Sequence, residues 1–366
     1  MPSKTNLASR LSRSCLAILL ATTVVGTAQA ANKKVTLAVG TTVLNIGYPM
    51  LTLPASLGYW KQEGYDVDVQ PVGASLQAIQ QVVAGNAEFG EVNSSTIVQS
   101  VADNDLPLKI VEANGVIDWA VAVDAKSGIK SAQDLKGKTI GVFSLATGGI
   151  PFLKSYLRNA GLDPDKDVSL VPLGLGAAPV QALKTGQVQG LLYWAAALAS
   201  FENAGLQLDQ LRGADWRTYP DYSLTTTSRT IAKDPDMVIA ISRGIAKATV
   251  FALANPDCAL KLHWKYYPST KPTGADEATL AKWDMNNLKA QLDSLADGYK
   301  INGGKYYGAV DPATFDKLQD FMVQAKLVSK KVPVEKYLVD IPDFYKKVND
   351  FDADAVRRQA MECKFD

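Results

Sequence analysis

Reactive side chains are scarce in this 366-residue sequence, and those present form no catalytic pattern. It contains one histidine, His263, and three cysteines, Cys15, Cys258 and Cys363. A metal or proton-transfer site needs clustered histidine, cysteine or carboxylate side chains, and no partner spacing surrounds His263. Gly174-Leu175-Gly176 lacks the third glycine of a dinucleotide fingerprint, and no nucleophile elbow or phosphate loop occurs. The sequence therefore predicts no enzyme, no metal site and no cofactor.

A second set of side chains is suited to noncovalent binding. Its members are small, hydroxylic, amide-bearing or aromatic, and Arg, Lys and His are absent among them. A neutral or weakly charged flat organic solute fits such groups best, because small-molecule sites are mostly apolar with a few placed polar groups. An inorganic anion held by backbone N–H groups at helix N-termini is the alternative. The predicted ligand contacts are Thr41, Thr42, Asn45, Ser75, Asn93, Ser94, Ser95, Asp118, Trp119, Ser144, Thr147, Gly148, Gly176, Tyr193 and Trp194.

The sequence contains one unit twice, at an offset of 101 residues. Residues 67–73, VDVQPVG, are matched by residues 168–174, VSLVPLG, and the same offset maps residues 39–41 onto residues 140–142. A period this long exceeds the roughly 20 to 50 residues of solenoid and propeller repeats. It predicts two similar lobes with a cleft between them.

Each copy has the order strand, helix, strand, helix, strand, which predicts parallel sheets with helices on both faces. In such sheets a ligand binds beyond the carboxyl ends of the strands, where most of the predicted contacts lie. Because these loops also begin helices, N-capping is an equal explanation for Ser75, Ser95 and Thr147. The expected strands are 35–39, 67–69 and 89–92 in the first copy and 139–143, 169–171 and 190–194 in the second.

Residues 1–30 have the pattern of a cleaved secretory signal peptide. Basic residues precede an apolar run, residues 15–26, which is followed by the small-x-small sequence of residues 28–30. This run is too short to span a bilayer, and no later segment is expected to be long and apolar enough. Export predicts a periplasmic protein with a disulfide between Cys258 and Cys363, although two separate buried thiols are the alternative.

The charge balance argues against nucleic acid as a partner. The whole chain carries 38 basic and 37 acidic residues, and removal of the signal peptide takes away three basic residues and no acidic ones. A slightly acidic protein without a basic tract lacks the electrostatic footprint of a nucleic-acid-binding protein. The expected partner is a small-molecule solute.

Four segments resemble the running pattern of the nitrate/sulfonate/taurine group of ABC-transporter substrate-binding proteins. They are residues 58–67, 84–90, 106–111 and 127–142, and the resemblance covers residues 35 to about 260. It implies the α/β periplasmic binding protein type II fold, with two similar lobes, a hinge between them, and delivery of the solute to an inner-membrane ABC permease with its ATPase. Residues from about 270 onward match less clearly and are expected to be helices packed on the first lobe.

The family architecture implies that the chain crosses between the lobes twice, at residues 114–123 and near residues 219–224. The expected lobes are residues 31–118 with 225–366, and residues 119–224. At the first crossing, Asp118 and Trp119 are expected to face the ligand, with plain packing between the lobes as the alternative for Trp119.

The resemblance and the residues together predict a monomeric periplasmic receptor that performs no chemistry. Two other classes stay open. The same fold occurs in a branch of pyrimidine-precursor synthases, and a ligand-sensing partner of a membrane receptor would use the same cleft.

Overall fold

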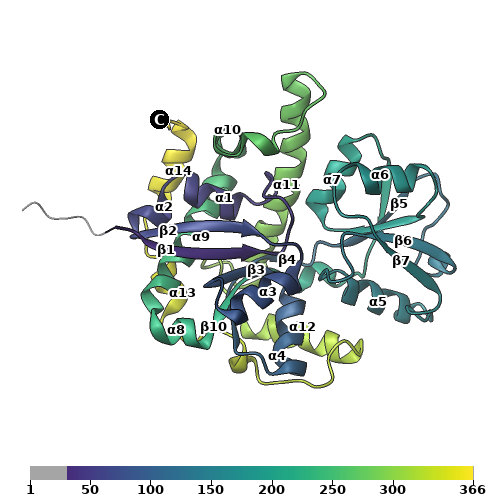
Figure 1. The fold of residues 1–366 in the computed structure, drawn as a ribbon, viewed down its shortest axis with the longest axis horizontal. Helices are drawn as coiled ribbons and strands as arrows, with labels where there is room; N and C mark the ends of the chain where they lie inside the picture. The colour runs from purple at the N-terminus through teal and green to yellow at the C-terminus, as the bar shows by residue number, and fades with distance from the viewer. Residues whose placement is uncertain (1–30, 366) are drawn as a thin grey trace, which may run out of the picture. The chain divides into compact units, whose positions relative to one another are not determined.

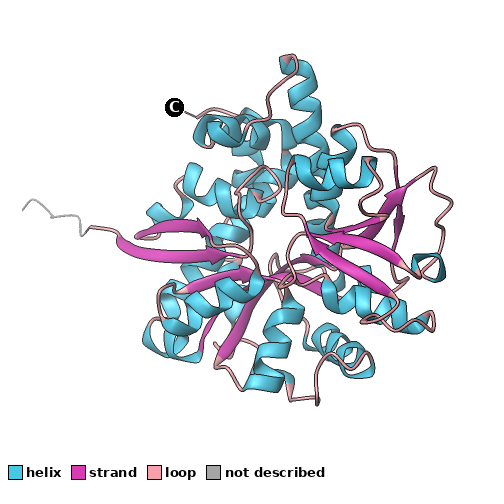
Figure 2. Ribbon diagram, turned by 45° about the vertical axis from the view of Figure 1, so that its right-hand side comes forward, coloured by secondary structure: helices cyan, strands magenta, loops and turns pink. Residues whose placement is uncertain are grey.

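The computed structural model describes residues 31–365, and the predicted signal peptide lies outside the described residues. Within this range the chain forms two five-stranded sheets with helices along both faces (Figures 1 and 2). The first sheet has the order β2-β1-β3-β10-β4, and the second has the order β7-β6-β8-β5-β9.

The strands are β1 (Lys33–Val39), β2 (Tyr65–Pro71), β3 (Phe89–Val92), β4 (Leu108–Val116), β5 (Ala120–Asp124), β6 (Lys138–Val142), β7 (Val168–Pro172), β8 (Gly190–Tyr193), β9 (Leu208–Leu211) and β10 (Pro220–Thr227). The α-helices are α1 (Pro49–Ser56), α2 (Tyr59–Gln62), α3 (Ser75–Ala84), α4 (Ser94–Asn104), α5 (Ile150–Asn159), α6 (Ala177–Lys184), α7 (Ala195–Asn203), α8 (Ser228–Lys233), α9 (Pro235–Ala254), α10 (Pro256–Tyr266), α11 (Glu277–Ile301), α12 (Pro312–Gln324), α13 (Phe344–Val348) and α14 (Ala353–Glu362). Short 3-10 helices are η1 (Gln133–Leu135), η2 (Trp216–Thr218), η3 (Pro268–Thr270) and η4 (Val334–Lys336).

The two sheets repeat one plan, as the sequence predicts. β1, β2 and β3 are parallel in the first sheet, and β6, β7 and β8 are parallel in the second. In each sheet the next strand, β10 or β5, is antiparallel to its neighbours. α5 lies on one face of the second sheet, and α6 and α7 lie on the other (Figure 1).

The strand pairing corrects the predicted alignment of the first strands. Val35 pairs with Val67 in the first sheet, and Lys138 pairs with Val168 in the second. The second strands are therefore 101 residues apart, but the first strands are 103 residues apart, so the predicted match of residues 39–41 is wrong by two positions. Because side chains alternate between the faces of a strand, a shift of two keeps the same residues buried. The hydrophobic pattern could not reveal the error.

The chain passes between the sheets twice. It leaves the first sheet after β4 and enters the second with β5, through residues 117–119, and it returns from β9 to β10 through residues 212–219. Both connections overlap or adjoin the crossings predicted from the sequence. They are short, and each leads directly into the antiparallel strand of the next sheet.

One of the C-terminal helices, α11, contacts elements beside both sheets. α11 packs against β4 of the first sheet and also against α7 beside the second. The Asn203 side chain in α7 donates a hydrogen bond to the Trp283 carbonyl at 2.8 Å, and the Arg217 guanidinium forms an ion pair with Asp297 at 2.6 Å. The helix thus contacts both repeated units, which its weak sequence match did not indicate.

α9 is long and apolar enough to cross a membrane, which the sequence analysis did not expect of any segment after the signal peptide. Its apolarity has another explanation, because most of the helix is buried within the structure. It packs against α1 and α14, and the Trp60 indole donates a hydrogen bond to the Ile241 carbonyl at 2.9 Å. A methyl group at Gly244 would lie 2.2 Å from that indole, so the glycine admits the ring. α9 is a core helix.

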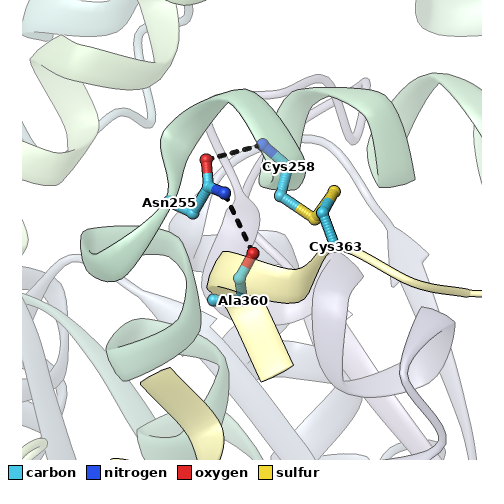
Figure 3. The surroundings of a disulfide bond; sticks show 4 residues. All are labelled: Asn255, Cys258, Ala360 and Cys363. Atoms are coloured by element: carbon cyan, nitrogen blue, oxygen red, sulfur yellow. Dashed lines mark hydrogen bonds between the residues drawn. A yellow bond between two sulfur atoms is a disulfide. The ribbon is translucent and has the colours of Figure 1, made fainter. Parts of the chain in front are cut away.

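The predicted disulfide joins Cys258 in α10 to Cys363 at the end of α14, with their Cα atoms 5.6 Å apart (Figure 3). A second link lies beside it. The Asn255 carboxamide accepts from the Cys258 amide at 3.1 Å and donates to the Ala360 carbonyl at 2.9 Å. Asn255 therefore caps α10 and also holds α14, so the contact between the two helices does not depend on the sulfur bridge alone.

Candidate functional site

A small cavity of about 30 Å³ lies where strands of both sheets end. Gly40 and Asn93 directly follow β1 and β3 of the first sheet, and Phe143 and Trp194 directly follow β6 and β8 of the second. This is the place where open α/β sheets bind ligands. The other residues that line it are Tyr48, Val116, Asp118, Trp119, Thr147, Asp221, Tyr222, Gln291 and Ser294.

Five of the predicted contacts come together in this cavity, namely Asn93, Asp118, Trp119, Thr147 and Trp194. A larger hollow of about 520 Å³ beside α6 and α7 is lined by residues that include Asn45, Gly176 and Trp194. The remaining predicted contacts line neither space: Thr41, Thr42, Ser75, Ser94, Ser95, Ser144, Gly148 and Tyr193.

Several of these remaining side chains lie directly behind the cavity wall. The Ser75 hydroxyl donates to the Asn93 side-chain oxygen at 2.8 Å and accepts from the Asn93 amide at 3.2 Å. The Tyr193 hydroxyl donates to the Gly174 carbonyl at 2.7 Å. Gly148 is a close-contact position, because a methyl group there would lie 2.4 Å from the Asn93 side chain. Ser75 and Gly148 thus help to fix Asn93, which faces the cavity.

The N-capping alternative for the three hydroxyl residues does not hold. The N-cap positions of α3, α4 and α5 are Ala74, Asn93 and Gly149, each one or two residues away from the predicted serine or threonine. Thr147 lines the cavity, and the Ser95 hydroxyl donates to the Gly148 carbonyl at 3.4 Å.

Aromatic rings from both repeated units form much of the wall. Trp194 lies between Trp119 and Phe143, with ring centroids 5.4 and 5.6 Å away and edge-to-face geometry in both pairs. Tyr48 and Tyr222 form a second pair, with centroids 5.7 Å apart. Trp119 also packs against Gly149, where a methyl group would lie 2.2 Å from the indole. Trp119 therefore faces the cavity and also packs against residues of the second unit.

The two crossings contribute matching pairs of residues to the cavity. Ala120 pairs with Tyr193 at the end of β8, and Ser223 pairs with Val92 at the end of β3. Asp118-Trp119 and Asp221-Tyr222 immediately precede Ala120 and Ser223, so they occupy equivalent positions in the repeat. Sequence reasoning found the first pair and missed the second. The signal was present, since each crossing carries an aspartate, an aromatic residue and a small residue in that order.

Both aspartates are buried at the N-terminus of a helix. Asp221 accepts hydrogen bonds from the Asn93 carboxamide at 2.7 Å and from the amide of Ser94, the first residue of α4, at 2.8 Å. Asp118 lies close enough to the amide of Ala195, the first residue of α7, for that amide to lower its pKa. The protein's own carboxylates therefore occupy the positive ends of these two helices.

Burial raises the pKa of both carboxyl groups, because it removes water from the charged form. It raises the pKa of Asp118 to about 6, against the opposing effect of the nearby Arg217 charge. It raises the pKa of Asp221 to about 7, against its hydrogen bonds from backbone amides and from Asn93. At pH 7.5 Asp118 is ionised, and Asp221 is partly protonated.

Two repeated α/β units, a double crossing and a cavity at the strand ends define a periplasmic-binding-protein fold. The chain belongs to the NMT1/THI5-like family, whose model matches residues 50–259. A protein of Brucella abortus (strain 2308), provisionally named a binding protein, is 25% identical over 298 residues, which cover 80% of this chain and 87% of the relative.

Solved structures share the fold at low sequence identity. The alkanesulfonate-binding protein SsuA from Xanthomonas axonopodis pv. citri, bound to MOPS, has a TM-score of 0.59 at 16% identity, covering 85% of this chain and 99% of that chain. The desulfurization enzyme DszB has a TM-score of 0.55 at 15% identity, covering 87% of this chain and 99% of that chain. The fold therefore serves both binding proteins and an enzyme, and the site must decide between them.

Proposed function

We propose that the protein is a periplasmic solute-binding receptor that captures one small organic molecule and delivers it to an ABC importer. The observation that carries this proposal is the lining of the cavity, which consists of aromatic rings and a few polar groups from both repeated units. Such a lining is typical of the sites that proteins use for small organic ligands. Of the predicted sulfonate-like, aromatic and heterocyclic solutes, the ring-lined wall favours the last two.

In this proposal the two units move as lobes, residues 31–118 with 225–366 and residues 119–224. The crossings at residues 117–119 and 212–219 act as the hinge, since a few connecting residues can absorb lobe closure. Ligand favours the closed form to the extent that it contacts both lobes at once. The receptor is a monomer, is exported by its signal peptide, and presents the closed form to an inner-membrane permease with its ATPase.

The first test is the melting temperature of residues 31–366 with a panel of alkylsulfonates, aromatic carboxylates, pyrimidines and aromatic amines. A ligand at about 100 times its dissociation constant stabilises the folded state by roughly 2.7 kcal/mol. Chromatography of each stabilising compound after incubation then separates a receptor from an enzyme, because a receptor returns the compound unchanged. Consumption of the compound would favour the enzyme class. If cells that lack the gene still import the stabilising compound, the result would favour a sensor over a transport receptor.

Replacing Trp194 by alanine should weaken binding of the stabilising compound about tenfold or more. Trp194 is the ring that contacts both Trp119 and Phe143 in the wall, and truncation of a central aromatic contact typically removes more than 1.4 kcal/mol of binding energy. Trp194 is less buried than Trp119, so its removal disturbs the core less. Calorimetric titration checks the affinity.

The matched control is Trp283→Ala, which removes a partly buried tryptophan of α11 that does not line the cavity. This variant should bind the stabilising compound with the same affinity as the unaltered protein. Equal affinity of both variants and the unaltered protein would show that the ligand binds elsewhere.

A further inference from the structure

We propose that the ligand of this cavity is a small, flat organic cation, whose protonated nitrogen lies against the Asp118 carboxylate and whose body lies among the aromatic rings. This inference rests on the proposed receptor function and names its ligand class. It goes against an anionic ligand of the kind held by the sulfonate-binding protein of the same fold.

Charge at the cavity wall is the first argument. Among residues 31–365, Asp118 and Asp221 are the charged residues that line the cavity, and no Arg, Lys or His of this range lines it. A buried charge is costly unless it is paired. An anionic ligand would face these carboxylates without a cation to offset them, whereas a cation would supply the missing partner.

Asp118 is the carboxylate that still has acceptor positions free for hydrogen bonds from a ligand. It is 6% exposed, and within residues 31–365 no side chain donates a hydrogen bond to it. Asp221, by contrast, has each of its two oxygens hydrogen-bonded, one to Asn93 and one to Ser94. An ionised carboxylate accepts at about four positions, and the amide of Ala195 is the backbone group beside Asp118 that could take up one of them.

The charged side chains near Asp118 form no ion pair with it, so a cationic ligand could take that place. From the second crossing, Arg217 is held by Asp297 at 2.6 Å, and the Arg212 side chain donates to Gln210. Both arginines attract Asp118 from a distance, but neither forms an ion pair with it or lines the cavity. From β10, Asp221 adds a second negative charge where it is ionised.

At two helices, the protein's own carboxylates lie where an anion could otherwise bind to the N-terminal amides. The N-terminal amides of α4 and α7 would offer hydrogen bonds and a positive dipole end to an anion. Asp221 accepts from the first amide of α4, and Asp118 places a carboxylate beside the first amide of α7. The alternative of an anion held by backbone N–H groups therefore loses these two sites.

Two neutral polar groups complete the cavity. Gln291 of α11 and Thr147 are each 7% exposed, both line the cavity, and within the described residues neither side chain has a hydrogen-bond partner. Such buried groups are normally paired, so they are placed to bond a ligand. Trp119, Trp194 and Tyr222 also line the cavity, and an aromatic ring attracts a cation that lies over its face.

Three probes with the same ring separate charge from shape: benzamidinium, benzamide and benzenesulfonate. Calorimetric titration at pH 7.5 should give benzamidinium an affinity at least about tenfold higher than that of benzamide, with benzenesulfonate weakest, because a charge-assisted hydrogen bond is roughly twice as strong as a neutral one. In Asp118→Asn the preference of the protein for benzamidinium over benzamide should fall to less than about threefold. Asparagine keeps an acceptor for the Ala195 amide, and the melting temperature checks the fold.

The control variant is Asp124→Asn, which removes one negative charge from the exposed end of β5 and should keep the full preference. The unaltered protein gives a second measurement. Benzamidinium affinity should fall as the pH drops from 7.5 to 5, because Asp118 and Asp221 take up protons, whereas benzamide affinity should stay constant.

The possible outcomes separate the two proposals. Equal or tighter binding of benzamide or benzenesulfonate would overturn the cation class and leave the receptor function standing. A benzamidinium preference that survives in Asp118→Asn would overturn the role of Asp118. If none of the three probes binds at about 10 mM, where even millimolar affinity is visible, both the ligand class and the placement of the receptor's pocket fall.

Discussion

Replacing Cys258 and Cys363 by alanine should lower the free energy of unfolding by roughly 4–5 kcal/mol. The bridge closes a loop with a sequence separation of 105 residues, and in the chain-entropy model the cross-link stabilises a protein by restricting its unfolded chain, more so for long loops. The folded state should change little, because Asn255 and Tyr59 also hold α14 through hydrogen bonds to Ala360 and Gln359. Denaturation in guanidinium chloride checks the value.

The slope of the unfolding curve tests the mechanism. Without the cross-link the unfolded chain expands and exposes more surface, so the dependence of the free energy on denaturant should become steeper. The unaltered protein in excess dithiothreitol is the matched control and should follow the same curve as the double variant. An unchanged midpoint in both would mean that the bridge contributes nothing to stability in solution.

Much of the fold follows from local patterns in the sequence. β3 occupies the predicted residues 89–92, α5 begins at the predicted Ile150 and ends before Gly161, and the repeat identifies the two sheets. These features depend on residues close together in the chain. The alignment of the first strands of the two copies could not be predicted in this way, because it is set by pairing between strands. A shift of two residues leaves the hydrophobic pattern unchanged.

The site could be predicted only in part, for a related reason. Loops after parallel strands are predictable from topology, which is why Asn93, Thr147 and Trp194 were found. Gln291 and Ser294 come from α11, a helix outside the region of clear family resemblance, and they reach the cavity only because that helix packs against both units. The roles of Asp221 and Tyr222 could have been predicted only by comparing this pair with Asp118-Trp119, because neither pair follows a parallel strand.

A pair of buried glutamates in the first sheet has a large expected effect on the response to pH. Glu91 of β3 and Glu112 of β4 both pair with Leu224 of β10, so they point to the same face of the sheet, and both are fully buried. The Asn114 carboxamide donates to one oxygen of Glu91 at 3.1 Å, but no described residue donates to either oxygen of Glu112. Burial raises the pKa of both carboxyl groups well above the usual range, and the Glu91 charge raises that of Glu112 further.

The direction of the pH effect follows from the raised values. Between the unfolded pKa of about 4.5 and the higher folded pKa, the folded protein keeps a proton on Glu112 that the unfolded chain has lost. The contribution of Glu112 to the free energy of unfolding is therefore fully present below pH 4.5 and is lost as the pH rises toward the folded pKa. The loss amounts to about 1.4 kcal/mol per pH unit for one such group.

Glu112→Gln should remove this loss, because glutamine fills the same space and does not ionise. The variant should match the unaltered protein near pH 4.5 and become more stable with each unit above it, by up to about 1.4 kcal/mol per unit. Urea denaturation at half-unit steps from pH 4.5 to 8 measures the difference. Glu335→Gln, a change at an exposed position, is the control and should run parallel to the unaltered protein. A constant difference between Glu112→Gln and the unaltered protein across this range would mean that Glu112 is ionised in the folded state, with a cation or water beside it in the core.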